Sequence, residues 1–401
     1  MDAIGSNFDI KDACMIKNIR YISVKEIGKF IILFIAVQLC IWYGGLADLI
    51  PIGLLNYWNM IQIGITVGAG FFCILKRRIS SITAVLILYK ATLLFSTILN
   101  GREVDIVEFS RYFGLIFLIE LFAKDTDVLI NIMMLIFEVM IYYNLFTCIQ
   151  NGPDLFGAYY GALGYDNGFP PYLLAAYFVA YNYHCKKGTW FRTVALIGAT
   201  HLTAFITFSA TGIVGIIVVD ILLVLNHFVK MKVSLFQSYL ILLGFQLAIV
   251  FFRIQNVFSF IIVNLLGKDL TFTGRTKDWD MALELIPSKI FFGHGMMDQS
   301  TEKSILGDVF CHNGVLEQLF RGGIIYFLTF AVAIFLISKA LKRTNNLIIQ
   351  NNILIICGYW VLSMTEVVLE GTMLCGMLAL LFAIGKSEKK NKWTVQRKEG
   401  R

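Results

Sequence analysis

The sequence predicts an all-α polytopic membrane protein, and three observations lead to this fold class. Hydrophobic residues make up 58% of the 401-residue chain, and charged residues make up only 15%. The mean hydropathy is +0.73. Long apolar runs also follow one another along the chain, separated by polar connections. A soluble protein of this length needs more polar surface, so the composition excludes a soluble globular domain.

Apolar runs of about 20 residues mark the predicted membrane spans, because a helix satisfies its own backbone hydrogen bonds across roughly 30 Å of hydrocarbon. We treat residues 1–401 as one membrane-embedded domain with about 12 spans. The predicted spans cover approximately residues 30–47, 55–75, 79–99, 105–123, 128–150, 170–185, 190–208, 211–229, 234–253, 323–339, 347–365 and 371–385.

The net charge of +7 is best explained by membrane orientation. Lys and Arg residues occur as short clusters in alternate connections, as at residues 76–78 and 186–187, and in the tail after residue 386. Such clusters stay on the cytoplasmic side. We therefore expect both termini in the cytoplasm of a prokaryotic cell membrane. The clusters form no continuous basic face, so we expect no nucleic-acid partner.

Neither the cysteines nor the N-terminus indicates a redox site or a cleaved leader. Most of the eight cysteines lie inside apolar runs, without the spacing of a disulfide framework or a zinc site. The basic N-terminal residues precede an apolar run that is too long for a secretory signal, and we expect an uncleaved first span.

Residues 254–322 form the largest connection, which the orientation places outside the cell as a loop with short amphipathic helices. Apolar residues recur with helical spacing from Arg275 to Ile286, and Pro287 ends the pattern. Arg275 at the start of this helix could bind an anion with its guanidinium and the first-turn N–H groups. The alternative is a solvated ion pair between Arg275 and Asp278 or Asp280.

Two histidines in the same loop are candidates for chemistry. The Gly-His-Gly sequence at 293–295 predicts a tight turn that exposes His294. A second amphipathic segment places His312, Leu316 and Leu319 on one helical face, with Asn313 adjacent and Asp308 as a candidate cap. A neutral His is a suitable general base for a sugar hydroxyl, although a structural histidine is the alternative. A metal site of His294, His312, Asp298 and Asp308 has no motif spacing in its favour, and we expect none.

Charged residues also occur inside the predicted spans. Isolated charges in lipid cost on the order of 3 kcal/mol each, so these residues should face a cavity or pair with one another. Several lie toward the outer ends of their spans and could share an outward-facing cavity with the large loop. The charged residues at membrane depth are Lys90, Glu108, Arg111, Glu120, Glu138, His201, Asp220, Glu366 and Glu370.

Two stretches, TGRTKDWDMALELIPSKIFFGHG and CHNGVLEQLFRGGIIYFLTF, resemble the signature of the O-antigen ligase and polymerase superfamily of membrane enzymes. The twelve-span topology with one large outer loop is similar to that family as well. The positions that carry the resemblance are Gly274, Arg275, Trp279, Pro287, Gly293, Gly295, His312, Asn313 and Leu316.

The resemblance implies inverting, metal-independent glycosyl transfer without a cofactor. The donor and acceptor would be oligosaccharides on undecaprenyl pyrophosphate, with Arg275 on the pyrophosphate and His312 as the general base. Many members of the family carry Ser-Arg where this chain has Ser209-Ala210. A second cation would then come from Arg111, Lys90 or Arg321. Further candidates for substrate contacts are Asn313, Glu366, Glu370 and His294.

The predicted function is polymerisation of repeat units into an O-antigen, capsule or exopolysaccharide, with a chain-length regulator and a flippase as candidate partners. Ligase-type transfer to another acceptor is the first alternative, since the two activities share the motif. A flippase or transporter is the second. Transporters concentrate polar groups at mid-membrane and often show repeats, whereas this chain has its densest polar set in the outer loop.

Overall fold

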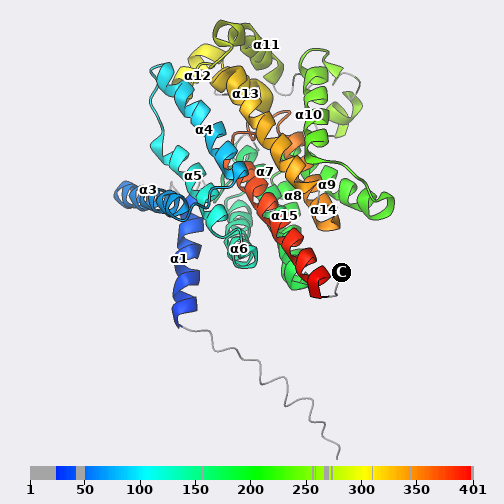
Figure 1. Cartoon of the computed structure of the whole chain (residues 1–401). Coiled ribbons are helices and arrows are strands. Elements are labelled where there is room, and N and C mark those ends of the chain that lie inside the picture. Colours follow the sequence, from blue (N-terminus) through cyan, green and yellow to red (C-terminus); the bar gives the residue numbers. More distant parts are fainter. Residues whose placement is uncertain are drawn as a thin grey trace, which may run out of the picture.

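The computed structural model describes residues 24–41, 50–155, 157–254, 257, 259–265, 271, 274–308, 310–342 and 346–398. Most of these residues belong to helices (Figure 1). The first half of the chain contains α1 (Val24–Cys40), α3 (Ile52–Leu75), α4 (Ser81–Leu99), α5 (Ile106–Leu121), α6 (Thr126–Asn151), α7 (Pro170–Lys187) and α8 (Trp190–Ile206). The second half contains α9 (Ala210–Val229), α10 (Leu235–Val250), the π-helix η5 (Phe260–Leu265), α11 (Arg275–Leu285), the 3-10 helix η6 (Ile286–Lys289), α12 (Gln299–Leu306), α13 (Gly314–Leu341), α14 (Leu347–Leu362) and α15 (Thr372–Lys398).

Helix α7 lies at the centre of the bundle and contacts α6, α8, α9, α14 and α15. Two prolines occupy its first turn, where their missing N–H groups cost nothing, and Gly188 ends it in the left-handed region with φ 69°. Most α7 side chains are buried within the main hydrophobic core. The central position of α7 therefore explains why this helix carries apolar side chains on all sides.

The helices agree with the predicted spans in position. Each predicted span overlaps a helix. Within the described residues, five helices are long and apolar enough to cross a membrane, namely α3, α4, α6, α9 and α13. Shorter apolar helices occur at 27–40, 190–206, 235–250 and 347–362. The fold is thus helical and membrane-type, while the count of twelve spans remains a prediction. Part of the predicted first span, residues 42–49, lies outside the described residues.

The connection between α6 and α7 contains a short antiparallel hairpin of β1 (Tyr160–Gly161) and β2 (Gly164–Tyr165). The 3-10 helix η3 (Asp166–Gly168) follows it and leads into α7. Asn144 in α6 accepts the N–H of Leu163 with its side-chain oxygen, at 2.8 Å. This hairpin is therefore tied to the end of α6.

Two pairs of ionisable side chains at membrane depth follow the alternative of internal pairing. Arg192 forms an ion pair with Glu138, and His201 lies 2.8 Å from Asp220. Such partners compensate for part of each other's desolvation cost.

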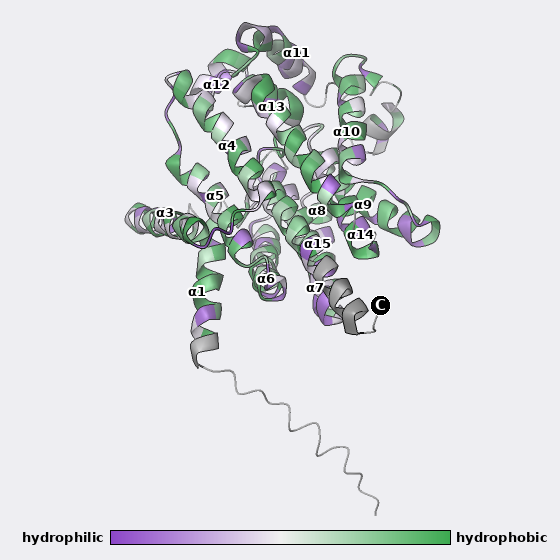
Figure 2. Cartoon of the chain, viewed as in Figure 1, coloured by the Kyte–Doolittle hydropathy of each residue, from purple (hydrophilic) through white to green (hydrophobic). Residues whose placement is uncertain are grey.

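Helices α11 and α12 lie together at one end of the bundle, next to α13 (Figure 1). We call this end the α11 face, defined by residues 274–313 and by the connecting segment 363–371 between α14 and α15. Figure 2 shows hydrophobic residues along most of the bundle helices and hydrophilic residues on α11. A second, smaller hydrophobic core holds this face together, and its buried members are Val250, Trp279, Ala282, Ile286, Leu306, Cys311, Leu316 and Phe320.

Helix α13 is longer than its predicted span of 323–339 and is kinked at Gly323, where φ is 66° and ψ is −171°. The segment 290–295 crosses the kink. The N–H groups of His294 and Gly295 donate to the carbonyls of Phe320 and Arg321. A side chain at Gly323 would lie 2.4 Å from the backbone of this segment. The glycine therefore permits the close approach, and the crossing segment satisfies backbone groups that the kink leaves without helical partners.

Candidate functional site

Helix α11 begins at Arg275, as the periodicity predicts, and passes into η6 at Ile286, one residue before Pro287. Gly274 precedes it with φ 90°, a conformation that favours glycine. Trp279 and Ala282 are fully buried against the small core. The indole N–H of Trp279 donates to the carbonyl of His312 at 3.3 Å. The buried face of α11 thus fixes the start of this helix over the backbone that carries His312.

Arg275 forms an ion pair with Glu366 of the connecting segment, with 2.7 Å between Nη2 and Oε1. The alternative of a surface pair with Asp278 or Asp280 is therefore wrong. Asp280 pairs instead with Arg253. The local sequence could not reveal this partner, because Glu366 is 91 residues away in the sequence. Only the tertiary structure places it beside the first turn of α11.

His312 does not lie on a helix, which corrects the predicted amphipathic segment. Its φ is 47°, in the left-handed region, and α13 begins only at Gly314. The side chain of Asn313 accepts the N–H groups of Val315 and Leu316, each at 3.1 Å, and caps the helix. The expected cap by Asp308 is therefore wrong. An N-cap residue stands outside the helix, and the residue before it is released from helical geometry.

The imidazole of His312 has two differently placed nitrogens. Nε2 lies 3.5 Å from Oδ2 of Asp308, whereas Nδ1 is buried and has no hydrogen-bond partner among the described residues. A proton on Nε2 directed at Asp308 leaves the lone pair on Nδ1. Burial, and next the positive charge of Arg275, lower the pKa of His312 below its usual value. The ring is therefore neutral at pH 7 and can accept a proton.

Asp278 is a member of this site that the sequence interpretation missed. The periodicity placed it away from the apolar side of α11, but its residue surface is only 8% exposed. Burial, and next the carboxylate of Asp308, raise the pKa of Asp278 to about 6. Ligand atoms of Asp278, Asp308 and His312 all lie within 4.8 Å of one another. Two carboxyls and an imidazole at this spacing can share protons or hold a divalent cation, so metal independence stays a prediction.

Residues 193–331 match the family described as O-Antigen ligase. The resemblance predicted from the sequence is therefore confirmed. The O-Antigen ligase match includes Arg275, His312 and the kink of α13, and it supports membrane glycan transfer of the O-antigen ligase or polymerase type. Glu366, which binds Arg275, lies outside the matched residues. No curated protein matches the chain.

His294 is buried, so the prediction that the Gly-His-Gly turn exposes it is wrong. Its ring stacks on Phe320 with 4.8 Å between the ring centroids. Nε2 lies 3.3 Å from the carbonyl oxygen of Leu285. Burial lowers the pKa of His294. These contacts hold the crossing segment on α13. In the same segment, Gly293 approaches the backbone of Arg321 too closely for a side chain.

Asn313 is fully buried and connects three parts of the site. Besides capping α13, its amide donates to Gln246 and to the carbonyl of Met364, the latter at 3.2 Å. The N–H of Gly314 donates to the carbonyl of Ser363 at 2.8 Å. The connecting segment therefore positions the residues beside His312 as well as Arg275. Sequence reasoning could not foresee this role, because the contacts join residues that are far apart in the chain.

Arg321 and Lys90 are both buried and both form ion pairs. Arg321 binds Glu302 at 2.7 Å and also binds Glu317 and Glu370. Burial raises the pKa of the Glu302 carboxyl. Lys90 pairs with Glu108 at 3.1 Å and donates to the carbonyl of Glu370 at 3.4 Å. These contacts tie α4, α12, α13 and the connecting segment together, which is the internal ion-pair alternative. Arg111 lines a cavity.

Proposed function

We propose that the chain polymerises oligosaccharide repeat units carried on undecaprenyl pyrophosphate, at the outer face of a prokaryotic cell membrane. One observation carries the proposal. His312 is neutral, its Nδ1 has no partner among the described residues, and it lies close enough to Arg275 at the start of α11 for the charge of Arg275 to lower its pKa. A base and an anion site close together are what glycosyl transfer from a pyrophosphate requires.

His312 would act on the acceptor. Nδ1 takes the proton of an acceptor hydroxyl as the oxygen attacks the anomeric carbon of the donor sugar, and a new glycosidic C–O bond forms. The resulting imidazolium is stabilised by Asp308, which faces Nε2. Attack from the side opposite the leaving group inverts the anomeric centre.

Arg275 would act on the donor. The bond between the anomeric carbon and the pyrophosphate oxygen breaks, and the electron pair leaves with the polyprenyl pyrophosphate. The guanidinium has five N–H donors, so it can keep Glu366 on Nη2 while its other donors bind phosphate oxygens. The N–H groups of the first turn of α11 add to the positive potential at this position.

Transfer of a finished glycan to a different acceptor is the second candidate, favoured by the description of the matched family as O-Antigen ligase. The two activities have the same bond chemistry and differ in the acceptor. A polymerase uses another lipid-linked repeat unit, and its product remains a substrate.

The deciding experiment supplies the purified protein in liposomes with lipid-linked repeat units and separates the products by size. A ladder of lengthening glycans supports the polymerase. Consumption of donor only when a different acceptor is added supports the ligase. The variant His312→Ala is expected to stay in the membrane and to form no ladder, and long chains from this variant would remove His312 from the role of base.

A further inference from the structure

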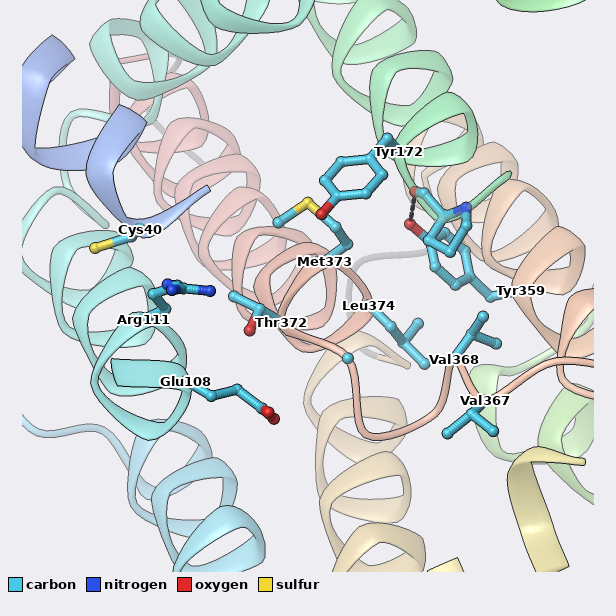
Figure 3. Close-up of a pocket in the computed structure, with 12 residues that line it drawn as sticks. Cys40, Glu108, Arg111, Tyr172, Tyr359, Val367, Val368, Thr372, Met373 and Leu374 are labelled. Atoms are coloured by element: carbon cyan, nitrogen blue, oxygen red, sulfur yellow. Dashed lines mark hydrogen bonds between the residues drawn. The ribbon is translucent and has the colours of Figure 1, made fainter. Parts of the chain in front are cut away.

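A cavity of about 240 Å³ lies among α5, α7 and the start of α15 (Figure 3). Arg111 and Glu108 line it from α5, and Tyr172 lines it from α7. Neither Arg275 nor His312 is among its lining residues. Pockets that enclose a whole small ligand measure roughly 300–1,000 Å³. A cavity of this volume therefore suits the headgroup of a larger ligand, with the rest of that ligand outside the cavity.

Arg111 gives one wall of the cavity a positive charge. The guanidinium of Arg111 is directed toward Thr372, the first residue of α15 (Figure 3). Helix N-termini carry partial positive charge, and α15 has no acidic residue in its first turn. The charge of Glu108 is balanced by Lys90, 3.1 Å away. A phosphate group in the cavity would meet both Arg111 and the first turn of α15.

The other walls are apolar. Tyr359, Val368, Met373 and Leu374 line the cavity, and the hydroxyl of Tyr359 donates to the carbonyl of Pro171 rather than into the space. An anionic end beside hydrocarbon walls fits the headgroup of an amphiphile, such as a phosphorylated lipid, better than a free sugar.

The connecting segment 363–371 joins this cavity to the site on α11. Glu366 binds Arg275, while Val367, Val368 and Gly371 of the same segment line the cavity. Five residues of fully extended chain span at most about 18 Å. The cavity wall at Gly371 therefore lies within that backbone distance of Glu366, a separation that an oligosaccharide of a few sugars can bridge.

We propose that this cavity binds the pyrophosphate headgroup of the acceptor lipid, through Arg111 and the first turn of α15. The inference rests on the proposed polymerase function. In that reaction the donor's pyrophosphate is at the breaking bond, beside Arg275 and His312. The acceptor's attacking hydroxyl is separated from its own pyrophosphate by a whole repeat unit, so a second headgroup site belongs some distance from His312.

The test counts undecaprenyl pyrophosphate molecules bound to the purified full-length chain in phosphatidylcholine nanodiscs, by native mass spectrometry. The unmodified chain is expected to bind two, and Arg111→Gln and Arg275→Gln are each expected to bind one. Lys303→Gln is the matched control, because Lys303 is an exposed cation of α12 that belongs to neither site. It is expected to bind two.

Two further variants keep the test independent of a folding defect. Arg111→Lys retains the charge and is expected to recover part of the binding. Thr372→Trp leaves Arg111 intact, fills the cavity from a half-buried position and is expected to lose one lipid. Unchanged binding of two lipids by both Arg111→Gln and Thr372→Trp overturns the proposal. The proposal is also overturned if the second undecaprenyl pyrophosphate is lost when the nanodiscs are made of phosphatidylglycerol, or when inorganic pyrophosphate is added at equal concentration. Either result identifies a general anion site.

Kinetics separate this proposal from the proposed function. Arg111→Gln is expected to raise the KM for a lipid-linked acceptor by about 10- to 100-fold, the effect of losing a charged hydrogen bond. The KM for a water-soluble acceptor sugar should not change. A ladder from the unmodified chain with an unaltered acceptor KM in Arg111→Gln refutes the acceptor site alone. Absence of any ladder from the unmodified chain refutes the polymerase, whereas the lipid count then still reports on the cavity.

Discussion

Substitution of Arg275 by Lys tests whether the guanidinium at the start of α11 binds a pyrophosphate. Nη2 of Arg275 lies 2.7 Å from Oε1 of Glu366, and the two side chains are only 16% and 12% exposed. Little solvent screening is therefore available, and Glu366 will hold whichever cation occupies position 275.

The expected loss follows from counting donors. Arg has five N–H donors in a planar fork, so it can bind Glu366 and a pyrophosphate at once. Lys concentrates its charge at one nitrogen and cannot reproduce both contacts. Removing one preorganised donor from a developing negative charge costs about 100- to 1,000-fold in kcat. We expect Arg275→Lys to show a loss of this size in the initial rate of ladder formation, with the protein still present in the membrane.

Two companion variants make the result interpretable. Lys303→Gln removes an exposed charge from α12 and should leave the rate unchanged. Glu366→Gln keeps an oxygen that accepts from Arg275 and should retain activity within about tenfold, since neutral partners contribute roughly half as much as charged ones. If Arg275→Lys keeps a rate close to that of the unmodified chain, the ion pair with Glu366 is structural and the pyrophosphate assignment is wrong.

Four further results are expected. The pKa of His312 is lowered from 6.5, and the base must be neutral. On the acid side of the pH–rate profile, activity should therefore be lost only as pH falls through that lowered pKa, and an acid-side inflection above 6.5 would contradict the base assignment. Chelation with EDTA should leave ladder formation unchanged, whereas a loss that Mg²⁺ or Mn²⁺ restores would assign the three-residue group around His312 to a metal. Arg321→Met should destabilise the protein by about 3–5 kcal/mol, seen as a lower thermal unfolding midpoint, since it leaves Glu302, Glu317 and Glu370 buried without their cation; an unchanged midpoint would contradict this. A reporter fused after Lys303 should score outside the cell and one after Lys342 inside, and the opposite result would reverse the orientation.

The sequence by itself determined the helical membrane-type fold and the helix at Arg275. Runs of apolar residues must form helices in lipid wherever they occur, so each predicted span overlaps a helix. The periodicity around Trp279 likewise determined α11, because a short amphipathic helix depends on nearest neighbours and a nearby proline. The resemblance in the loop pointed to the family that residues 193–331 match.

Only the tertiary structure decided how the site is assembled. The sequence made both His294 and His312 candidates for chemistry, yet packing buries His294 against Phe320, while Asn313 caps α13 and frees His312 from the helix. The partner of Arg275 comes from the connecting segment at Glu366, which no local pattern could reveal. Periodicity reports which side of a helix is apolar, but the choice of partner for a buried charge depends on distant segments that the fold brings within a few ångströms.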